Sequence, residues 1–238
     1  MRWYTEDDQE FLAYVRVRRK QRDAFMDVIA ISELLRGIGL ESPVAREQAR
    51  AILERHGMTS PRKLNMSIEK APEARTLLFA RALFLCRSPD CAALAAPTVA
   101  GREVIIVEPA HCVICAGSGQ RRAALLLARD MVTTGRLRLL LIGGTPHQHR
   151  ELAQPLAEGG VELRAVDGLK RAHSAVEAAR QAAWADVVAI WAATPVKHKV
   201  TQVYTDAVPP RTLRVIVARR GLESLCADVR TALCNPQN

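Results

Sequence analysis

The chain has 238 residues, of which 49% are hydrophobic and 25% charged, and this balance is typical of a soluble globular protein. It lacks both the ~20 consecutive apolar residues of a membrane-spanning helix and a signal peptide, so we expect a cytoplasmic protein with reduced cysteines. The 34 Lys and Arg residues outnumber the 25 Asp and Glu residues, and the net charge of +9 favours an anionic partner, most simply nucleic acid.

The first 85 residues have helical patterning, which predicts an N-terminal helical domain over 1–85. Gly and Pro residues mark the boundaries between the helices; Ser42 is expected to cap one helix, with Pro43 in its first turn. Four helices are expected: one from Thr5 through the basic run 16–22, one over 28–35, one from Pro43 to Gly57, and one over about 72–85.

The second and third helices, joined by Gly37-Ile-Gly39, have the outline of a helix-turn-helix or helix-hairpin-helix unit. The third helix carries Arg46, Arg50 and Arg55, which in such a unit would face phosphates. The same outline occurs in any helical bundle, and a bundle that packs against the second domain is the favoured interpretation. The basic run 16–22 is likewise interpreted as a solvated face.

Four cysteines form two pairs, Cys86 with Cys91 and Cys112 with Cys115, on either side of a short apolar run. Thiolates at these spacings can converge on one tetrahedral ion, so residues 86–118 are predicted to form a four-cysteine element of the zinc-ribbon or knuckle type. Structural zinc is favoured over buried reduced thiols and over a redox pair, and His111 could replace one ligand. The two remaining cysteines, Cys226 and Cys234, are interpreted as core thiols of a terminal helix.

From residue 103 onwards, short apolar runs alternate with segments of helical period, which predicts an α/β domain over 103–238. Apolar runs without polar alternation are typical of parallel strands covered on both faces, so a five-stranded parallel Rossmann-like sheet is expected. The predicted strands are 104–107, 137–142, 161–166, 187–191 and 213–217. The predicted helices are 121–132, 146–157, 173–184, 197–206 and 222–233.

In such sheets ligands bind beyond the carboxyl ends of the strands. The residues expected there are mostly small or cationic, and we predict that they bind an anion or nucleic acid. They are Arg121, Arg122, Gly143, Gly144, Thr145, Thr194, Lys197, Lys199, Arg219 and Arg220. Neither a GxGxxG nor a Walker motif is present, so ordinary dinucleotide or ATP binding is not supported.

Two residues at this edge could act as a general base, Asp167 and His198. Asp167 could equally cap the following helix, and Gly143-Gly144 could be only a tight turn. His198 stands between Lys197 and Lys199 at a helix start, where two positive charges oppose the helix dipole unless an anion binds.

Several motifs of the second half resemble those of the bacterial domain-of-unknown-function family 2325. The resemblance covers about residues 137–233 and implies a small Rossmann-like domain in the bacterial cytosol, without a settled activity. The family favours Ser-His where this chain has Lys197-His198. The segments that carry the resemblance are Leu141-Ile-Gly-Gly-Thr-Pro-His147, Val166-Asp-Gly168, Ala185-Asp-Val-Val188, Thr194 to His198, and Arg220-Gly-Leu-Glu-Ser-Leu225.

Together these patterns favour a nucleic-acid-associated bacterial protein, an accessory or defence factor, that binds a phosphate-bearing partner at the carboxyl edge of the sheet. A structural zinc ion is expected to hold the helical domain onto the α/β domain. Two alternatives stay open: an N-glycosidase or hydrolase that acts on a nucleotide or nucleic acid, with Asp167 or His198 as base, and a sensor of a small phosphorylated ligand.

Overall fold

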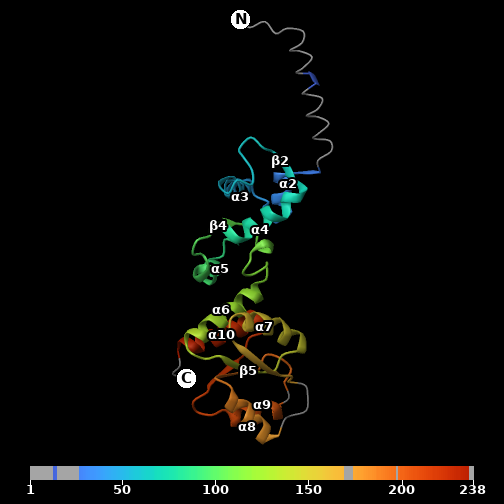
Figure 1. Ribbon diagram of the computed structural model, residues 1–238. Coiled ribbons are helices and arrows are strands. Elements are labelled where there is room, and N and C mark those ends of the chain that lie inside the picture. Colours follow the sequence, from blue (N-terminus) through green and yellow to red (C-terminus); the bar gives the residue numbers. More distant parts are fainter. Residues whose placement is uncertain (1–12, 15–26, 169–173, 197, 236–238) are drawn as a thin grey trace. The chain divides into compact units, whose positions relative to one another are not determined.

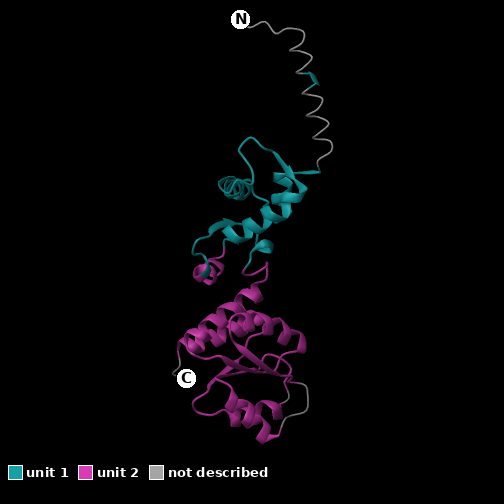
Figure 2. Ribbon diagram, in the orientation of Figure 1, with its two compact units in different colours: residues 1–87, 98–113 teal, residues 88–97, 114–238 magenta. Residues whose placement is uncertain are grey.

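The computed structural model describes residues 13–14, 27–168, 174–196 and 198–235. The chain forms two compact units (Figure 2). Unit 1 comprises residues 1–87 and 98–113, and unit 2 comprises residues 88–97 and 114–238. Among the described helices, none combines the length and the apolar character that crossing a membrane requires.

Unit 1 combines helices with short strands around one core. Its helices are α2 (Ile31–Arg36), α3 (Pro43–Arg55) and α4 (Ala71–Arg81), with 3-10 turns η1 (Ile68–Lys70) and η3 (Pro109–His111). Its strands are β1 (Val28–Ala30), β2 (Asn65–Ser67), β3 (Ala82–Leu85) and β4 (Glu103–Ile106). Of the expected first helix, only Ala13 and Tyr14 lie within the described residues, and both are helical.

The expectation of an all-helical front half is corrected at two places. Residues 28–30 form β1, antiparallel to β2, instead of beginning a helix, because Val28 and Ile29 fit a pleated surface better than a helix. Residues 82–85 form β3 instead of ending α4. All four β3 residues are buried, and a short run that is apolar all round does not distinguish a buried strand from a buried helix.

The predicted third helix is confirmed as α3. Ser42 caps it by accepting a hydrogen bond from the Ala45 N–H at 3.0 Å, and Pro43 occupies the first turn. Just beyond its end, Gly57 adopts a φ of 71°, a conformation that glycine takes without strain.

The three arginines of α3 form hydrogen bonds and ion pairs with other residues of unit 1. Arg50 donates to the Glu54 carboxylate and to three carbonyls of the following loop, those of residues 60, 61 and 63. Arg46 donates to the carbonyls of Leu40 and Glu41, and Arg55 forms an ion pair with Glu103. These contacts tie α3 to neighbouring segments along its length, as in a packed helical unit.

Unit 2 is built on a four-stranded parallel sheet in the order β6-β5-β7-β8. The strands are β5 (Arg138–Ile142), β6 (Glu162–Val166), β7 (Val187–Trp191) and β8 (Leu213–Val217). The helices are α5 (Pro89–Ala95), α6 (Gly119–Thr133), α7 (Pro146–Glu158), α8 (Ala175–Trp184), α9 (His198–Ala207) and α10 (Leu222–Cys234), and η2 (Ala96–Thr98) follows α5.

The expected fifth strand does not join this sheet. Residues 103–106 form β4, which pairs in parallel with β3 in a separate two-stranded sheet. An apolar run predicts a strand but not its partner, and here the partner is the apolar run 82–85 that was expected to be helical. The other four predicted strands, and the helices between them, are confirmed within about two residues.

Helices cover both faces of the sheet (Figure 1). The core on one face contains side chains of α6, α7 and α10, and the core on the other contains side chains of α8 and α9. The central strand β7 is buried along its whole length. Trp191 at its end is fully buried and donates its indole N–H to the Arg219 carbonyl at 2.9 Å, which satisfies its polar atom.

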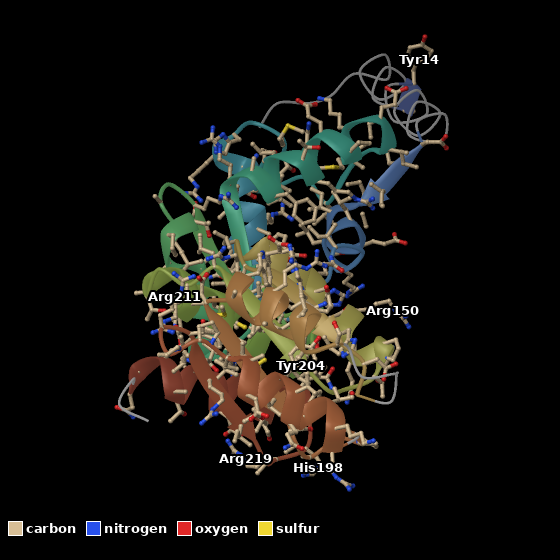
Figure 3. The ribbon with its side chains drawn as sticks, turned by 90° about the horizontal axis from the view of Figure 1, so that it is seen from below. Tyr14, Arg150, His198, Tyr204, Arg211 and Arg219 are labelled. Atoms are coloured by element: carbon tan, nitrogen blue, oxygen red, sulfur yellow. The ribbon has the colours of Figure 1, made fainter. Side chains whose placement is uncertain are left out.

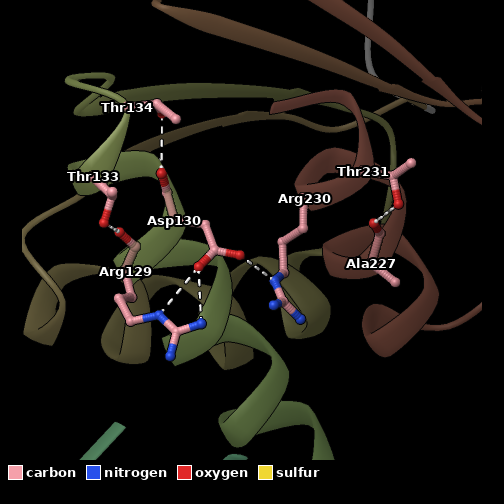
Figure 4. A network of polar contacts seen from close by, with 7 residues as sticks. All are labelled: Arg129, Asp130, Thr133, Thr134, Ala227, Arg230 and Thr231. Atoms are coloured by element: carbon pink, nitrogen blue, oxygen red, sulfur yellow. Dashed lines mark hydrogen bonds and ion pairs between the residues drawn. The ribbon is translucent and has the colours of Figure 1, made fainter. Parts of the chain in front are cut away.

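An ion-pair network joins α6 to α10 on the first of these faces (Figure 4). The Asp130 carboxylate accepts from Arg230 of α10 at 2.6 Å and from Arg129 of its own helix at 3.1 Å. Apolar side chains of the two helices belong to one buried cluster, among them Ala124, Leu127, Ala128 and Met131 of α6 and Leu222, Leu225 and Val229 of α10. Apolar packing therefore holds the two helices together, and the ion pair between Asp130 and Arg230 favours one alignment of α6 along α10.

At the amino ends of the strands, Asp186 joins β5 to β7. Its carboxylate accepts from the backbone N–H groups of Leu137 and Arg138 at 2.9 and 3.0 Å, and from the Arg138 guanidinium at 2.8 Å. The hydrogen bond from Arg138 lowers the pKa of Asp186 below its ordinary value, partial burial opposes this, and the Leu137 N–H adds to the lowering.

We predict that Asp186→Asn lowers the free energy of unfolding by about 1–3 kcal/mol at pH 7, because a partly buried charged acceptor is lost. A depressed pKa contributes stability above the unfolded value of aspartate, and this stability disappears as the pH falls through the folded value. The difference between wild type and variant in urea unfolding should therefore shrink below about pH 4. Asp206→Asn, at an exposed site on α9, is the control, and an equal loss in both variants would contradict the prediction.

Candidate functional site

Four buried cysteines form the most clearly assembled chemical site, called the thiol cluster below. Cys86, Cys91, Cys112 and Cys115 place their four sulfur atoms within 4.8 Å of one another, and none forms a disulfide. A tetrahedral ion with bonds of ~2.3 Å holds its sulfurs about 3.8 Å apart, so only a small closure is required. The cluster could therefore hold a metal ion, as the pairing of these residues in the sequence predicts.

Regular elements bring each cysteine to the cluster. Cys86 directly follows β3, and Cys91 lies in the first turn of α5, which begins with Pro89. Cys112 ends the 3-10 turn η3 and donates its N–H to the Pro109 carbonyl at 3.1 Å. The Val113 N–H then donates to the Phe84 carbonyl at 3.0 Å, which fixes the adjacent Cys112 beside the end of β3.

The turn after Cys115 is conformationally strained. Ala116 has a φ of 46°, and in this left-handed region a side chain costs about 1–2 kcal/mol. Gly117 follows with a φ of 80°, and the Ser118 N–H donates to the Cys115 carbonyl at 2.8 Å. Strain of this kind persists only where the surroundings impose it, and here it accompanies the convergence of the cysteines.

A cation accompanies the sulfurs. Arg122, in the first turn of α6, hydrogen-bonds to Cys91 and lies 3.7 Å from the Asp90 carboxylate. Partial burial acts to lower the pKa of Arg122, but the Cys91 hydrogen bond and the charges of two cluster sulfurs and Asp90 outweigh it, and the pKa is raised. A metal held by four thiolates carries net negative charge, which this guanidinium offsets in part.

His111, the alternative ligand, and the two remaining cysteines do not join the cluster among the described residues. His111 is exposed, and its ring lies against Gly39, where a Cβ atom would approach within 2.2 Å of the ring. Cys226 is a core thiol as predicted, and burial foremost raises its pKa to about 12. Cys234 is exposed, which corrects its prediction as a core thiol, because it is the last residue of α10.

The backbone N–H groups of the glycine turn after β5 already have hydrogen-bond acceptors within the protein. The N–H groups of Gly143, Gly144 and Thr145 donate to the Val166 carbonyl, the Thr194 hydroxyl and the Gln148 side chain, each at 2.9 Å. Thr145 and Gln148 form a capping box at the start of α7. An anion at this turn would have to displace these bonds, so the geometry favours a closed turn over an open oxyanion cradle.

Thr194 closes the carboxyl edge between β5 and β7. Its hydroxyl accepts from the Gly144 N–H and donates to the Trp191 carbonyl at 2.8 Å. A Cβ atom at Gly143 would come within 2.8 Å of the Thr194 hydroxyl, and Gly143 has a φ of 102°. Gly143 is therefore required for the close approach of the 194–196 segment.

The remaining predicted residues of this edge lie on the ends of the neighbouring elements. Asp167 follows β6 and is partly buried, whereas His198 and Lys199 open α9 and are exposed. Lys197 lies outside the described residues. The assignment of Asp167 and His198 as catalytic groups stays a prediction.

The predicted cations are not gathered at one edge. Arg121 pairs with Glu158 and donates to the Ile114 carbonyl, while Arg122 serves the thiol cluster. Because β4 is not part of the unit 2 sheet, the segment that precedes α6 does not follow a strand of that sheet. Arg219 follows β8 and pairs with Asp228, and the adjacent Arg220 is exposed.

The link between Arg122, Asp90 and the cysteines is absent from the sequence-based predictions. Asp90 precedes Cys91 directly, and Arg122 lies in the first turn of α6, so the available signal is proximity along the chain. The pattern assigns Arg122 to anion binding instead, because cations near a strand end favour that interpretation.

Comparison with known proteins gives no relative from which a function could be transferred: no protein-family model matches the chain, and no curated protein matches it significantly. The resemblance to family 2325 therefore stays a prediction.

We predict that the purified protein contains about one metal ion per chain and that Cys91→Ser reduces this content to near zero, because three thiolates hold the ion far more weakly. Cys234→Ser removes an exposed thiol outside the cluster and should retain the metal. Elemental analysis measures the metal content, and equal metal content in the two variants would contradict the site.

Removal of the metal by a chelator should lower the Tm of the wild type by about 5–10 °C and leave the Tm of Cys91→Ser nearly unchanged.

We predict that Ala116→Gly stabilises the metal-loaded protein by roughly 0.5–1 kcal/mol, since relief of the left-handed strain exceeds the entropy cost of glycine. Ala92→Gly, at an exposed position within α5, should instead destabilise it by about 1 kcal/mol. Thermal unfolding of both variants provides the comparison. A loss of stability in both would show that Ala116 is not strained in solution.

Proposed function

We propose that the thiol cluster holds a structural zinc ion. Four buried sulfurs within 4.8 Å support a closed tetrathiolate site, in which no position is left for substrate or water. Thiolate ligands favour zinc among the common divalent ions that tetrahedral protein sites bind. The ion would stabilise the local fold between residues 86 and 115, without taking part in a reaction.

The arrangement of unit 2 supports a Rossmann-like fold. Numbered from β5, its strand order is 2-1-3-4, which matches the flavodoxin-like order of doubly wound sheets, and helices cover both faces. The order reverses between β5 and β7, where Thr194 meets Gly144. The resemblance of residues 137–233 to family 2325 agrees with this proposal and adds no activity.

The protein is proposed to associate with nucleic acid in the cytoplasm of a bacterium. The observation that carries this proposal is the charge excess of 34 cations over 25 carboxylates, a net charge of +9. A polymer with one phosphate per nucleotide is the simplest partner for such a surface, and its binding releases condensed counterions. Exposed cations at the ends of the unit 2 strands, such as Arg211 and Arg220, are available for phosphate contacts.

This proposal predicts a steep salt dependence. Affinity for a fluorescent RNA or DNA duplex of about 30 nucleotides per strand should fall about tenfold or more between ~50 and ~200 mM salt, which corresponds to about two or more phosphate contacts. Fluorescence anisotropy of the metal-loaded protein measures it. Absence of binding at ~50 mM salt, or an affinity that does not change with salt, would refute nucleic-acid association and leave the zinc proposal intact.

A further inference from the structure

An arginine-lined crevice lies at the amino edge of the unit 2 sheet, opposite the edge where ligands were expected. It has a volume of about 330 Å³ and will be called the amino-edge crevice. Three of its lining residues are arginines and none is acidic. The lining residues are Arg136, Val208, Pro209, Pro210, Arg211, Thr212, Leu213 and Arg214.

Asp186, whose backbone carbonyl contacts the lining residue Arg136, has its carboxylate already engaged. Asp186 binds Arg138 and two backbone N–H groups, so its charge is compensated outside the crevice. The carboxylate nearest to the crevice along the chain is that of Asp206, two residues before Val208, and it is exposed near the end of α9 and is not a lining residue. Arg136 donates to the backbone carbonyl of Asp186 at 3.2 Å, which orients the guanidinium without cancelling its charge. Within the part of the chain that the structure describes, the crevice therefore carries excess positive charge, and a cleft lined by one sign of charge attracts counter-ions.

The loop that forms one wall is ordered by its own bonds. Pro209 and Pro210 restrict the backbone, and the Thr212 N–H donates to the Pro209 carbonyl at 3.0 Å. The Thr212 hydroxyl donates to the Ala185 carbonyl at 3.2 Å. Arg211 and Arg214, on either side of this buried threonine, are both exposed. Their backbones are thus fixed while their side chains are exposed, so binding requires ordering of the two side chains but little ordering of the loop backbone.

The opposite edge offers less to an anion. There the amides of the glycine turn are bonded within the protein, and Arg219 is paired with Asp228. Figure 3 shows Arg211 well separated from Arg219 and His198, as the direction of β8 requires. The two edges are therefore separate surfaces that can be tested independently.

We propose that the amino-edge crevice binds a backbone phosphate of the nucleic acid, with Arg211 and Arg214 as its ligands and Arg136 as a positioning residue. Guanidinium groups bind phosphate oxygens through paired N–H donors, and such contacts fix the strand without reading its sequence. This inference rests on the proposed association with nucleic acid and assigns it a site.

The test compares three double variants that each remove two positive charges. Arg211→Gln/Arg214→Gln alters the crevice, Lys199→Gln/Arg220→Gln alters the carboxyl edge, and Arg62→Gln/Lys63→Gln alters an exposed turn of unit 1. Anisotropy titrations with the same RNA and DNA, at several salt concentrations, give affinity and salt slope. Circular dichroism and thermal unfolding establish that each variant is folded.

The crevice variant should lose about tenfold in affinity at ~100 mM salt, and its salt slope should fall by about two, for RNA and DNA of any sequence. The unit 1 control should lose much less. Hydrogen exchange in residues 208–214 should slow when the oligonucleotide binds, and this readout does not depend on a substitution.

Other outcomes would overturn the inference. If the wild type binds but the crevice variant matches the unit 1 control, the site is wrong while nucleic-acid association stands. A selective loss in the carboxyl-edge variant would place the contact at that edge. A lower Tm with unchanged affinity would mean that Arg211 and Arg214 only offset the negative ends of nearby helices. If the wild type does not bind at low salt, the proposed function fails as well.

Discussion

Four sulfur atoms gathered in a dry environment set the strongest constraint on this protein. Neutral thiols are weak hydrogen-bonding groups and gain little from one another, whereas thiolates repel unless a cation lies among them. Here they stand within 4.8 Å, beside the Arg122 guanidinium and a strained turn at Ala116. A bound ion would account for all three features, since it would compensate charge, draw the two chain segments together and maintain an unfavourable backbone conformation.

The two ends of the unit 2 sheet differ in a way that strand order alone does not predict. At the carboxyl end, polar groups of the chain bond to one another, with Thr194 between β5 and β7 and a capping box at the start of α7. At the amino end, the Asp186 carboxylate compensates Arg138, and three further arginines line an open crevice. The amino end therefore presents an arginine-lined crevice, whereas at the carboxyl end, where doubly wound sheets bind ligands, the polar groups of the glycine turn are bonded within the chain.

Periodicity predicted most of unit 2, because its central strands β5 and β7 are apolar on both faces and its helices are amphipathic. Strands β7 and β8 have the bounds expected from the sequence. The same patterns could not assign residues 103–106 to a sheet, since pairing depends on which strand lies nearby. The apolar run 82–85 was ambiguous for a similar reason. The cysteine spacing predicted the thiol cluster. Arg121 and Arg219 were expected to bind an anion, and in the structure they form ion pairs with Glu158 and Asp228.

The position of β8 at the edge of its sheet has a consequence for self-association. An edge strand leaves backbone donors and acceptors without a neighbouring strand, and Ile216 adds an exposed apolar side chain to it, 60% accessible. Exposed edge strands of this kind can pair with a strand of another chain, and a charged residue in the strand commonly prevents such pairing. Arg214 occupies that position, between Leu213 and Val215. Its guanidinium would thus protect solubility as well as contact a ligand, and replacing it with an apolar residue would favour intermolecular β-sheet.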